Sequence, residues 1–224
     1  MDFPERQLLI RADGDVEGWR SNACRKEPET YSWLKDVISD GVVMYDIGAC
    51  VGSYGLIAGA LGANVHAFEP VGMSFGHLVE NTMFNNLQKQ ITCHPIALVS
   101  ATELAEIRLQ WPYAGAASHS WEDKPHQENG SFRFGINVIR ERLDDYVDRF
   151  HLPVPDAVKI DVDGEEVEVI DGGRETLSQA SSIIVEVQMN LVMNIRAMVQ
   201  GMGFRFVEQT PRTDNSYNML FRKG

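Results

Sequence analysis

Short apolar runs alternate with amphipathic segments along most of the chain. Residues 42–47, 65–68 and 157–160 are mostly apolar, which is typical of parallel strands that are buried on both faces. Residues 53–61 lie between the first two runs, have the length of a helix and are followed by Gly62, a residue type that commonly ends helices. This alternation predicts an α/β fold in which helices connect parallel strands.

The rest of the chain continues the alternation up to a pair of terminal strands. Further strands are expected at residues 91–98, 105–109, 136–139 and 183–187, and further helices at residues 29–39, 74–84, 165–170 and 191–199. Two final strands end the pattern, which predicts a doubly wound, mostly parallel sheet with a C-terminal antiparallel hairpin. A lead-in segment and a helix are expected over residues 1–40, and one domain over residues 41–224.

The composition fits an ordinary globular protein and argues against a nucleic-acid partner. The chain has 224 residues, of which 44% are hydrophobic and 23% are charged, and its net charge is −12. Nucleic-acid affinity depends largely on Lys and Arg contacts to phosphates. An acidic chain without a basic run is therefore not expected to bind DNA or RNA.

Cysteine usage and the lack of targeting segments predict a cytoplasmic protein. Three cysteines are too few for a disulfide framework or a zinc cluster, which favours a reducing, intracellular setting. The first residues lack the basic start and the apolar run of a signal peptide. No apolar segment has the length of a transmembrane helix, so no membrane partner is expected, and the sequence indicates no oligomeric state.

Two glycines and an acid mark the turn after the first core strand. Asp46 lies near the end of this strand, and Gly48 and Gly52 fall in the turn before the next helix. In doubly wound sheets, ligands bind outside the carboxyl ends of the strands, where the strand order reverses. A side chain at position 48 is expected to block a ligand there, and Asp46 is expected either to anchor the turn or to bind a cationic group through water.

A second acid ends the second core strand. Glu69 lies 21 residues after Gly48, and a carboxylate at this place can accept hydrogen bonds from both ribose hydroxyls of an adenosyl group. A glycine turn by itself is a weak signal, and a turn without a chemical role is the alternative. The two glycines together with an acid at the end of each strand favour an adenosyl cofactor.

The glycine spacing distinguishes a dinucleotide site from a site for S-adenosylmethionine. Gly48, Gly52 and Gly55 read Gly-x-x-x-Gly-x-x-Gly, whereas a dinucleotide site needs Gly-x-Gly-x-x-Gly so that the pyrophosphate can reach the helix. Asp46 is also expected to repel a phosphate. S-adenosylmethionine carries no phosphate, and acids tolerate its sulfonium and ammonium groups. The turn therefore favours S-adenosylmethionine.

An ordered set of short motifs resembles one enzyme family. The motifs are Asp46-Ile47-Gly48-Ala49-x-x-Gly52, Ala67-Phe68-Glu69-Pro70, Glu80-Asn81, Asn85-Asn86-Leu87, Leu143-Asp144-Asp145, Lys159-Ile160-Asp161-Val162-Asp163-Gly164-x-Glu166 and Ile184-Val185-Glu186-Val187. Together, over about residues 40 to 190, they resemble the FkbM-type S-adenosylmethionine-dependent methyltransferases. The resemblance implies a class I, Rossmann-like methyltransferase fold and, usually, methylation of a hydroxyl on a small molecule, a glycan or a secondary metabolite.

Ten residues are expected to contact the cofactor when the resemblance is combined with the strand positions. They are Asp46, Gly48, Ala49, Cys50, Gly52, Phe68, Glu69, Pro70, Ala97 and Asp161. Two positions depart from the family's usual pattern. Cys50 stands in place of the usual Asn, and Asp163 stands in place of the usual Glu, which keeps the charge but moves it by one methylene.

Acids after the fourth core strand are the expected catalytic groups. An alcohol acceptor needs a base within hydrogen-bond reach or a metal that lowers its pKa. Asp161 is expected to contact either the acceptor or the methionine end of the cofactor, and Asp163 follows it in the turn. Helix capping by these two acids is the structural alternative. With Glu165 and Glu186 they offer oxygen ligands for Mg²⁺, a cofactor that is possible but not expected.

The segment from residue 112 to 135 is expected to be a long loop over the active site. His119 and His126 lie in it, and either is a candidate for the general base; a solvated loop histidine is the alternative. The acceptor is expected to be a hydroxyl on a small molecule or a glycan. Its identity cannot be read from the sequence.

Three other functions are also compatible with the sequence. A methyltransferase fold that only binds a ligand is one, because Cys50 and the loop depart from the family pattern. A nucleic-acid methyltransferase is disfavoured by the acidic charge and by the sequence at residues 159–164, where amino-methylating enzymes tend to have Asn/Asp-Pro-Pro-aromatic. A nicotinamide-dependent oxidoreductase is disfavoured by the glycine spacing.

Overall fold

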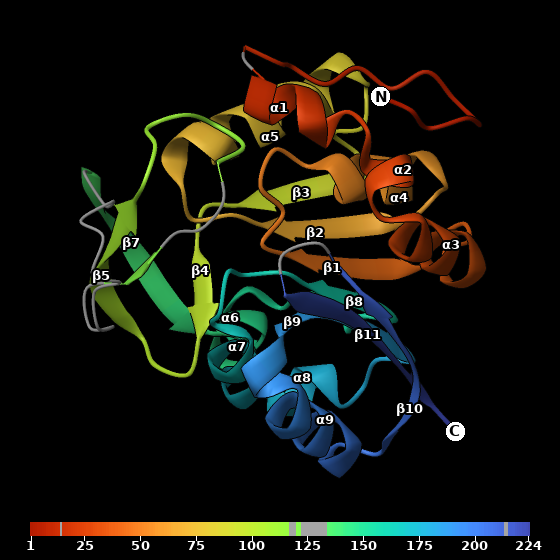
Figure 1. The fold of residues 1–224 in the computed structure, drawn as a ribbon, viewed down its shortest axis with the longest axis vertical. Coiled ribbons are helices and arrows are strands. Elements are labelled where there is room, and N and C mark those ends of the chain that lie inside the picture. The colour runs from red at the N-terminus through yellow and green to blue at the C-terminus, as the bar shows by residue number, and fades with distance from the viewer. Residues whose placement is uncertain (14, 117–119, 122–133, 213–214) are drawn as a thin grey trace.

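A seven-stranded sheet forms the centre of the protein (Figure 1). A computed structural model describes residues 1–13, 15–116, 120–121, 134–212 and 215–224. In spatial order, the strands are β10 (Phe204–Pro211), β11 (Ser216–Lys223), β9 (Ser182–Gln188), β8 (Ala157–Ile160), β1 (Val43–Ile47), β2 (Asn64–Phe68) and β3 (Ile91–His94). The five strands from β9 to β3 are parallel, and β11 runs antiparallel to both β9 and β10. The doubly wound sheet with its C-terminal hairpin is thus confirmed.

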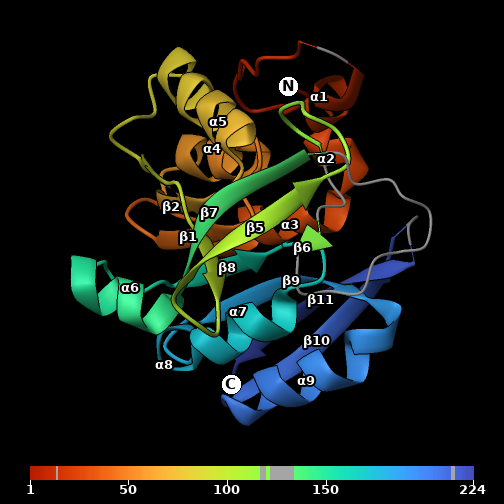
Figure 2. The same cartoon turned by 90° about the vertical axis from the view of Figure 1, so that its left-hand side faces the viewer.

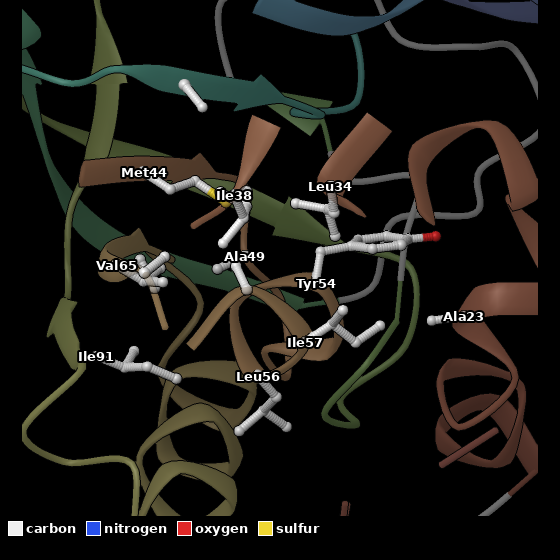
Figure 3. Close-up of a cluster of buried hydrophobic side chains, with 14 of the residues drawn as sticks. Ala23, Leu34, Ile38, Met44, Ala49, Tyr54, Leu56, Ile57, Val65 and Ile91 are labelled. Carbon is white, nitrogen blue, oxygen red and sulfur yellow. The ribbon is translucent and has the colours of Figure 1, made fainter. Parts of the chain in front are cut away.

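Helices cover both faces of this sheet (Figures 1 and 2). One face carries α3 (Pro28–Val37), α4 (Ser53–Ala60) and α5 (Gly72–Phe84), and the other carries α6 (Leu143–Phe150), α7 (Glu166–Gly172), α8 (Arg174–Leu177) and α9 (Val192–Gly201), which follows the 3₁₀ turn η1 (Met189–Leu191). Side chains of one strand alternate between the faces. Met44 packs into the first core, shown in Figure 3, and Tyr45 packs into the second.

A smaller second sheet lies beside the main one (Figure 2). Its strands, in spatial order, are β4 (Ala97–Val99), β7 (Phe134–Arg142), β5 (Glu103–Leu109) and β6 (Ser120–Trp121). The single strand expected at residues 91–98 is therefore wrong. Pro95 divides it, because proline has no N–H for the ladder, and the chain leaves β3 for β4 in the other sheet. The sequence pattern also does not predict the helix α6.

The N-terminal segment folds onto the main sheet. It contains two short helices, α1 (Asp15–Arg20) and α2 (Ala23–Lys26), where the sequence shows no clear period. Phe3 and Leu8 are buried in the same core as α3 and α4, so the first residues of the chain cover part of that core. The domain boundary expected after residue 40 stays a prediction. Of the helices in the described residues, none combines the length and the apolar character needed to cross a bilayer.

A buried hydrogen bond joins α3 to the first residue of β9. Trp33 Nε1 donates to Ser182 Oγ at 2.9 Å, and both side chains are almost fully buried. In Ser182→Ala the indole N–H loses its acceptor, so we expect the free energy of unfolding to fall by roughly 1–3 kcal/mol. Urea denaturation measures this, with Ser181→Ala at the exposed neighbouring position as the control. Equal stabilities of the two variants would contradict the prediction.

Candidate functional site

One cavity collects most of the residues that the sequence singled out. Seven of the ten expected cofactor residues line it, namely Gly48, Cys50, Phe68, Glu69, Pro70, Ala97 and Asp161. Ala49 lines a recess that adjoins this cavity. Asp46 and Gly52 are not among the described residues that line the cavity. The carboxyl ends of β1, β2 and β8 thus meet at one place, as expected for a doubly wound sheet.

The turn after β1 brings two parts of the backbone very close together. Gly48 has φ +82°, and a Cβ built on it would lie 1.8 Å from the backbone oxygen of Asp161. The glycine is therefore required by the protein's own chain at the end of β8, which is a more immediate reason than the approach of a ligand. Cys50 also has positive φ, at 53°, a conformation that side chains other than Asn and Asp adopt rarely.

Glu69 is held rigidly at the end of β2. Its Oε2 accepts a hydrogen bond from Cys50 N at 2.9 Å, and its Oε1 accepts one from Val71 N at 2.8 Å. The residue is 7% exposed, and burial raises the pKa of its carboxyl to about 7. Each oxygen keeps a lone pair that can accept a further hydrogen bond. The carboxylate is thus fixed in orientation and can receive two donors from the cavity.

Asp46 lies behind the turn. It is 1% exposed, and its Oδ1 is 3.9 Å from Lys159 Nζ. Burial raises the pKa of this carboxyl, and the ammonium of Lys159 opposes the rise. The position agrees with a residue that anchors the turn, which was one of the two expected roles, whereas a contact with a ligand stays a prediction.

Asp161 is an anion at the edge of the cavity. Lys159 Nζ donates to its Oδ2 at 2.9 Å. Burial alone would raise the pKa of Asp161, but Lys159 and Arg20 outweigh it and hold that pKa below its usual range. An ionised carboxylate with a low pKa is a weak proton acceptor and a good partner for a cation.

Three further acids line the cavity. Asp163 has φ 53°, is exposed and lines the cavity, as do Glu165 and Glu186. The N-cap position of α7 is Glu165, so neither Asp161 nor Asp163 is the N-cap residue of this helix. Burial raises the pKa of Glu186, and the nearby negative charge of Asp161 raises it further.

The apolar end of the cavity is built from β2, β4 and β5. Phe68, Ala97, Val99 and Ile107 line it. The Phe68 ring stacks on the His94 ring, with centroids 4.6 Å apart and planes inclined by 16°. A flat apolar group can be buried at this end, close to Glu69.

Sequence reasoning missed the basic residues of the site. Arg20 and Lys26 come from the N-terminal helices, and Arg212 directly follows β10. Arg212 Nη1 lies 2.8 Å from Glu27 Oε1, and its Nε lies 3.4 Å from Glu186 Oε2. No motif marks these residues, because they reach the cavity only through long-range folding.

The expected loop histidines cannot be placed. His119 and His126 lie outside the described residues, so their role as a general base stays a prediction. Within the described part of the chain, no group of three or more His, Cys, Asp or Glu side chains is arranged to hold a metal ion.

Comparison of the structure with solved structures shows its fold. Magnesium protoporphyrin IX methyltransferase from Synechocystis PCC 6803, solved with S-adenosylmethionine bound, superimposes with a TM-score of 0.57 at 15% identity, over 96% of this chain and 87% of that one. Precorrin-6y C5,15-methyltransferase from Geobacter metallireducens gives 0.52 at 16% identity, over 97% and 93%. An rRNA methylase from Streptococcus thermophilus gives 0.57 at 10% identity, over 89% and 96%. The fold is that of the class I methyltransferases.

Sequence comparison is more specific. The hexuronic acid methyltransferase AglP of Haloferax volcanii is 27% identical over 175 residues, which are 76% of this chain. The match spans 66% of the relative's own length. The model of the methyltransferase FkbM domain matches residues 46–206, which include the glycine turn, Glu69 and Asp161. The chain belongs to the FkbM methyltransferase family.

Proposed function

We propose that this protein uses S-adenosylmethionine to methylate a hydroxyl oxygen on a sugar or another small molecule. Glu69 carries the proposal, because it is a buried carboxylate that lines the cavity beside the glycine turn. A carboxylate fixed in this place suits the two hydroxyls of a ribose. Membership of a methyltransferase family supports the reaction class.

The residues of the cavity fit the parts of this cofactor. Phe68 and Ala97 offer apolar surface for the adenine, and Glu69 offers acceptors for the ribose. Asp161 is ionised and can hold the ammonium of the amino-acid part. When bound, the cofactor supplies an electrophilic methyl group, and the protein has to align the acceptor oxygen with it.

Glu186 is our first candidate for the group that takes the hydroxyl proton. It lines the cavity, and its raised pKa makes it a better proton acceptor at neutral pH than Asp161. Ser216 Oγ donates to its Oε1 at 2.9 Å, which fixes the carboxyl. Asp163 and His119 are the other proposed bases.

The acceptor class is proposed from the relative. AglP is named for a hexuronic acid, and a sugar acid or a glycan that contains one is therefore the first acceptor to test. The acidic charge of the chain supports a small-molecule or glycan acceptor over a nucleic acid. Mg²⁺ is not part of the proposal.

Titration calorimetry tests the cofactor half of the proposal. We expect the protein to bind S-adenosylmethionine and S-adenosylhomocysteine and to show no heat of binding with NAD. A mass-spectrometric assay then tests uronic acids, neutral sugars and short RNA for a gain of one methyl group. Failure to bind either sulfur compound would overturn the proposal and favour a binding module without this activity.

Cofactor affinity should depend on pH through Glu69. Its pKa is about 7 in the free protein, and only the ionised form can accept hydrogen bonds from both ribose hydroxyls at full strength, so binding favours loss of the proton. Affinity for S-adenosylhomocysteine should therefore fall as the pH falls below 7, by roughly tenfold between pH 8 and pH 6. Glu69→Gln lacks the titrating group and should lose this dependence. A parallel pH dependence in both proteins would contradict the prediction.

Glu186→Gln separates proton transfer from cofactor binding. We expect kcat to fall by about 100-fold, because general-base catalysis is removed, while the affinity for S-adenosylhomocysteine stays unchanged. Glu208→Gln, at an exposed position on β10, is the control. The acidic limb of the kcat pH profile should disappear only in Glu186→Gln. An unchanged profile would transfer the role to Asp163 or His119.

A further inference from the structure

Arg20 extends the site beyond the family-matched residues. It lies at the end of α1 and lines both the main cavity and the adjoining recess. Ser53 Oγ donates to its backbone oxygen at 3.0 Å, which ties α1 to the start of α4. Gly48, Cys50 and Asp161 line the same two spaces. The guanidinium is thus part of the surface around the glycine turn.

This guanidinium differs from the other cations of the site. Its Nε and Nη2 both donate to one backbone oxygen, that of Gly115, at 3.3 and 3.1 Å. By contrast, Lys26, Lys159 and Arg212 each lie within 3.1 Å of a carboxylate oxygen. Among the side chains that the structure describes, no ion pair includes Arg20. The charge of Arg20 acts on Asp161, but a guanidinium that lines a cavity and makes no direct ion pair can still bind an anionic ligand group.

The residues beside Arg20 indicate which ligand group would supply the anion. Cys50 donates its N–H to Glu69 and lines the cavity together with Arg20. The guanidinium and the Glu69 carboxylate therefore line one cavity. Asp161 completes it with a negative charge. A guanidinium beside a carboxylate matches the two charges of an amino acid, because the first can bind its carboxylate and the second its ammonium.

We propose that Arg20 is the ion-pair partner for the α-carboxylate of the cofactor's amino-acid part. The inference rests on the proposed function and assigns to the N-terminal segment a direct part in cofactor binding. The guanidinium offers donors in a planar fork, which suits a carboxylate better than a single ammonium does. The same chemistry would suit the carboxylate of a sugar acid, and the experiment has to separate the two sources.

Calorimetry with two ligands isolates the carboxylate. S-adenosylmethionine and its decarboxylated form share the adenine, the ribose, the sulfonium and the amine, and differ in this one group. For Arg20→Gln we expect about 30-fold weaker binding of S-adenosylmethionine and unchanged binding of the decarboxylated compound. The second ligand also shows that the variant is folded. Arg20→Lys should recover part of the loss, and Arg25→Gln, at an exposed position on α2, should show none.

The outcomes separate the inference from the function on which it rests. Equal losses for both ligands, or no loss for either, would overturn the role of Arg20. An unchanged affinity for S-adenosylmethionine with a raised KM for uronic acids but not for neutral sugars would also overturn it, and would assign Arg20 to the acceptor. A parent protein that binds neither ligand would instead overturn the proposed function.

Discussion

Glu69→Ala is expected to weaken S-adenosylhomocysteine binding by about 1,000-fold. A hydrogen bond to a charged group contributes roughly 1.5–3 kcal/mol, and the variant removes two that the ribose would make. It also removes the acceptors of Cys50 N and Val71 N, so the turn itself becomes less fixed. The loss should therefore exceed that of a residue which only contacts the ligand.

A series of variants separates these two causes. Glu69→Gln keeps the size of the side chain and one acceptor oxygen, so it should bind more tightly than Glu69→Ala but less tightly than the parent. Glu208→Ala, on the exposed face of β10, should bind as the parent does. Calorimetry gives all three affinities. An affinity of Glu69→Ala within tenfold of the parent would show that the ribose is not bound at this carboxylate.

Gly48→Ala is expected to lower the free energy of unfolding by roughly 3 kcal/mol or more. A positive φ costs a residue with a Cβ about 1–2 kcal/mol, and crowding in a closely packed site costs a further 1–3 kcal/mol or so. The added methyl would lie 1.8 Å from the backbone oxygen of Asp161. Because backbone cannot rotate away as a side chain can, either the turn or the end of β8 has to move.

Denaturation in urea measures this effect, and Gly72→Ala provides the matched control. Gly72 is the first residue of α5, and a Cβ built there meets no atom within 4 Å. Alanine favours helices over glycine by up to about 1 kcal/mol, so this control should be as stable as the parent or more stable. Wild-type stability of Gly48→Ala would contradict the contact between the turn and β8.

The central sheet and the glycine turn could be predicted because their signals are local. The strands β1, β2 and β8 are short, mostly apolar runs, and Gly48 and Glu69 directly follow β1 and β2. The second sheet could not be predicted, because its pairing depends on a break at Pro95 and on partners far apart in the chain. Ala97, for example, is paired with Arg140. The length and edges of β7 follow from that pairing and not from its own pattern.

The ion pairs of the site also differ in whether the sequence could predict them. Asp161 and Lys159 are two residues apart, so one motif contains both. Arg212 and Glu27 meet across 185 positions, and nothing near either residue marks the pair. Sequence patterns report what a segment needs locally, whereas ion pairs between distant segments depend on the completed fold.

The position of β1 has a consequence for synthesis on the ribosome. It pairs with β2 on one side and with β8 on the other, where Met44 is opposite Ala157. Pairing with β2 becomes possible after some twenty more residues have been synthesised. Pairing with β8 becomes possible only after more than a hundred more residues. Until then a buried apolar strand presents an open edge, which is the feature that nascent chains aggregate through. Slow translation beyond residue 68 should therefore increase the dependence of this protein on chaperones.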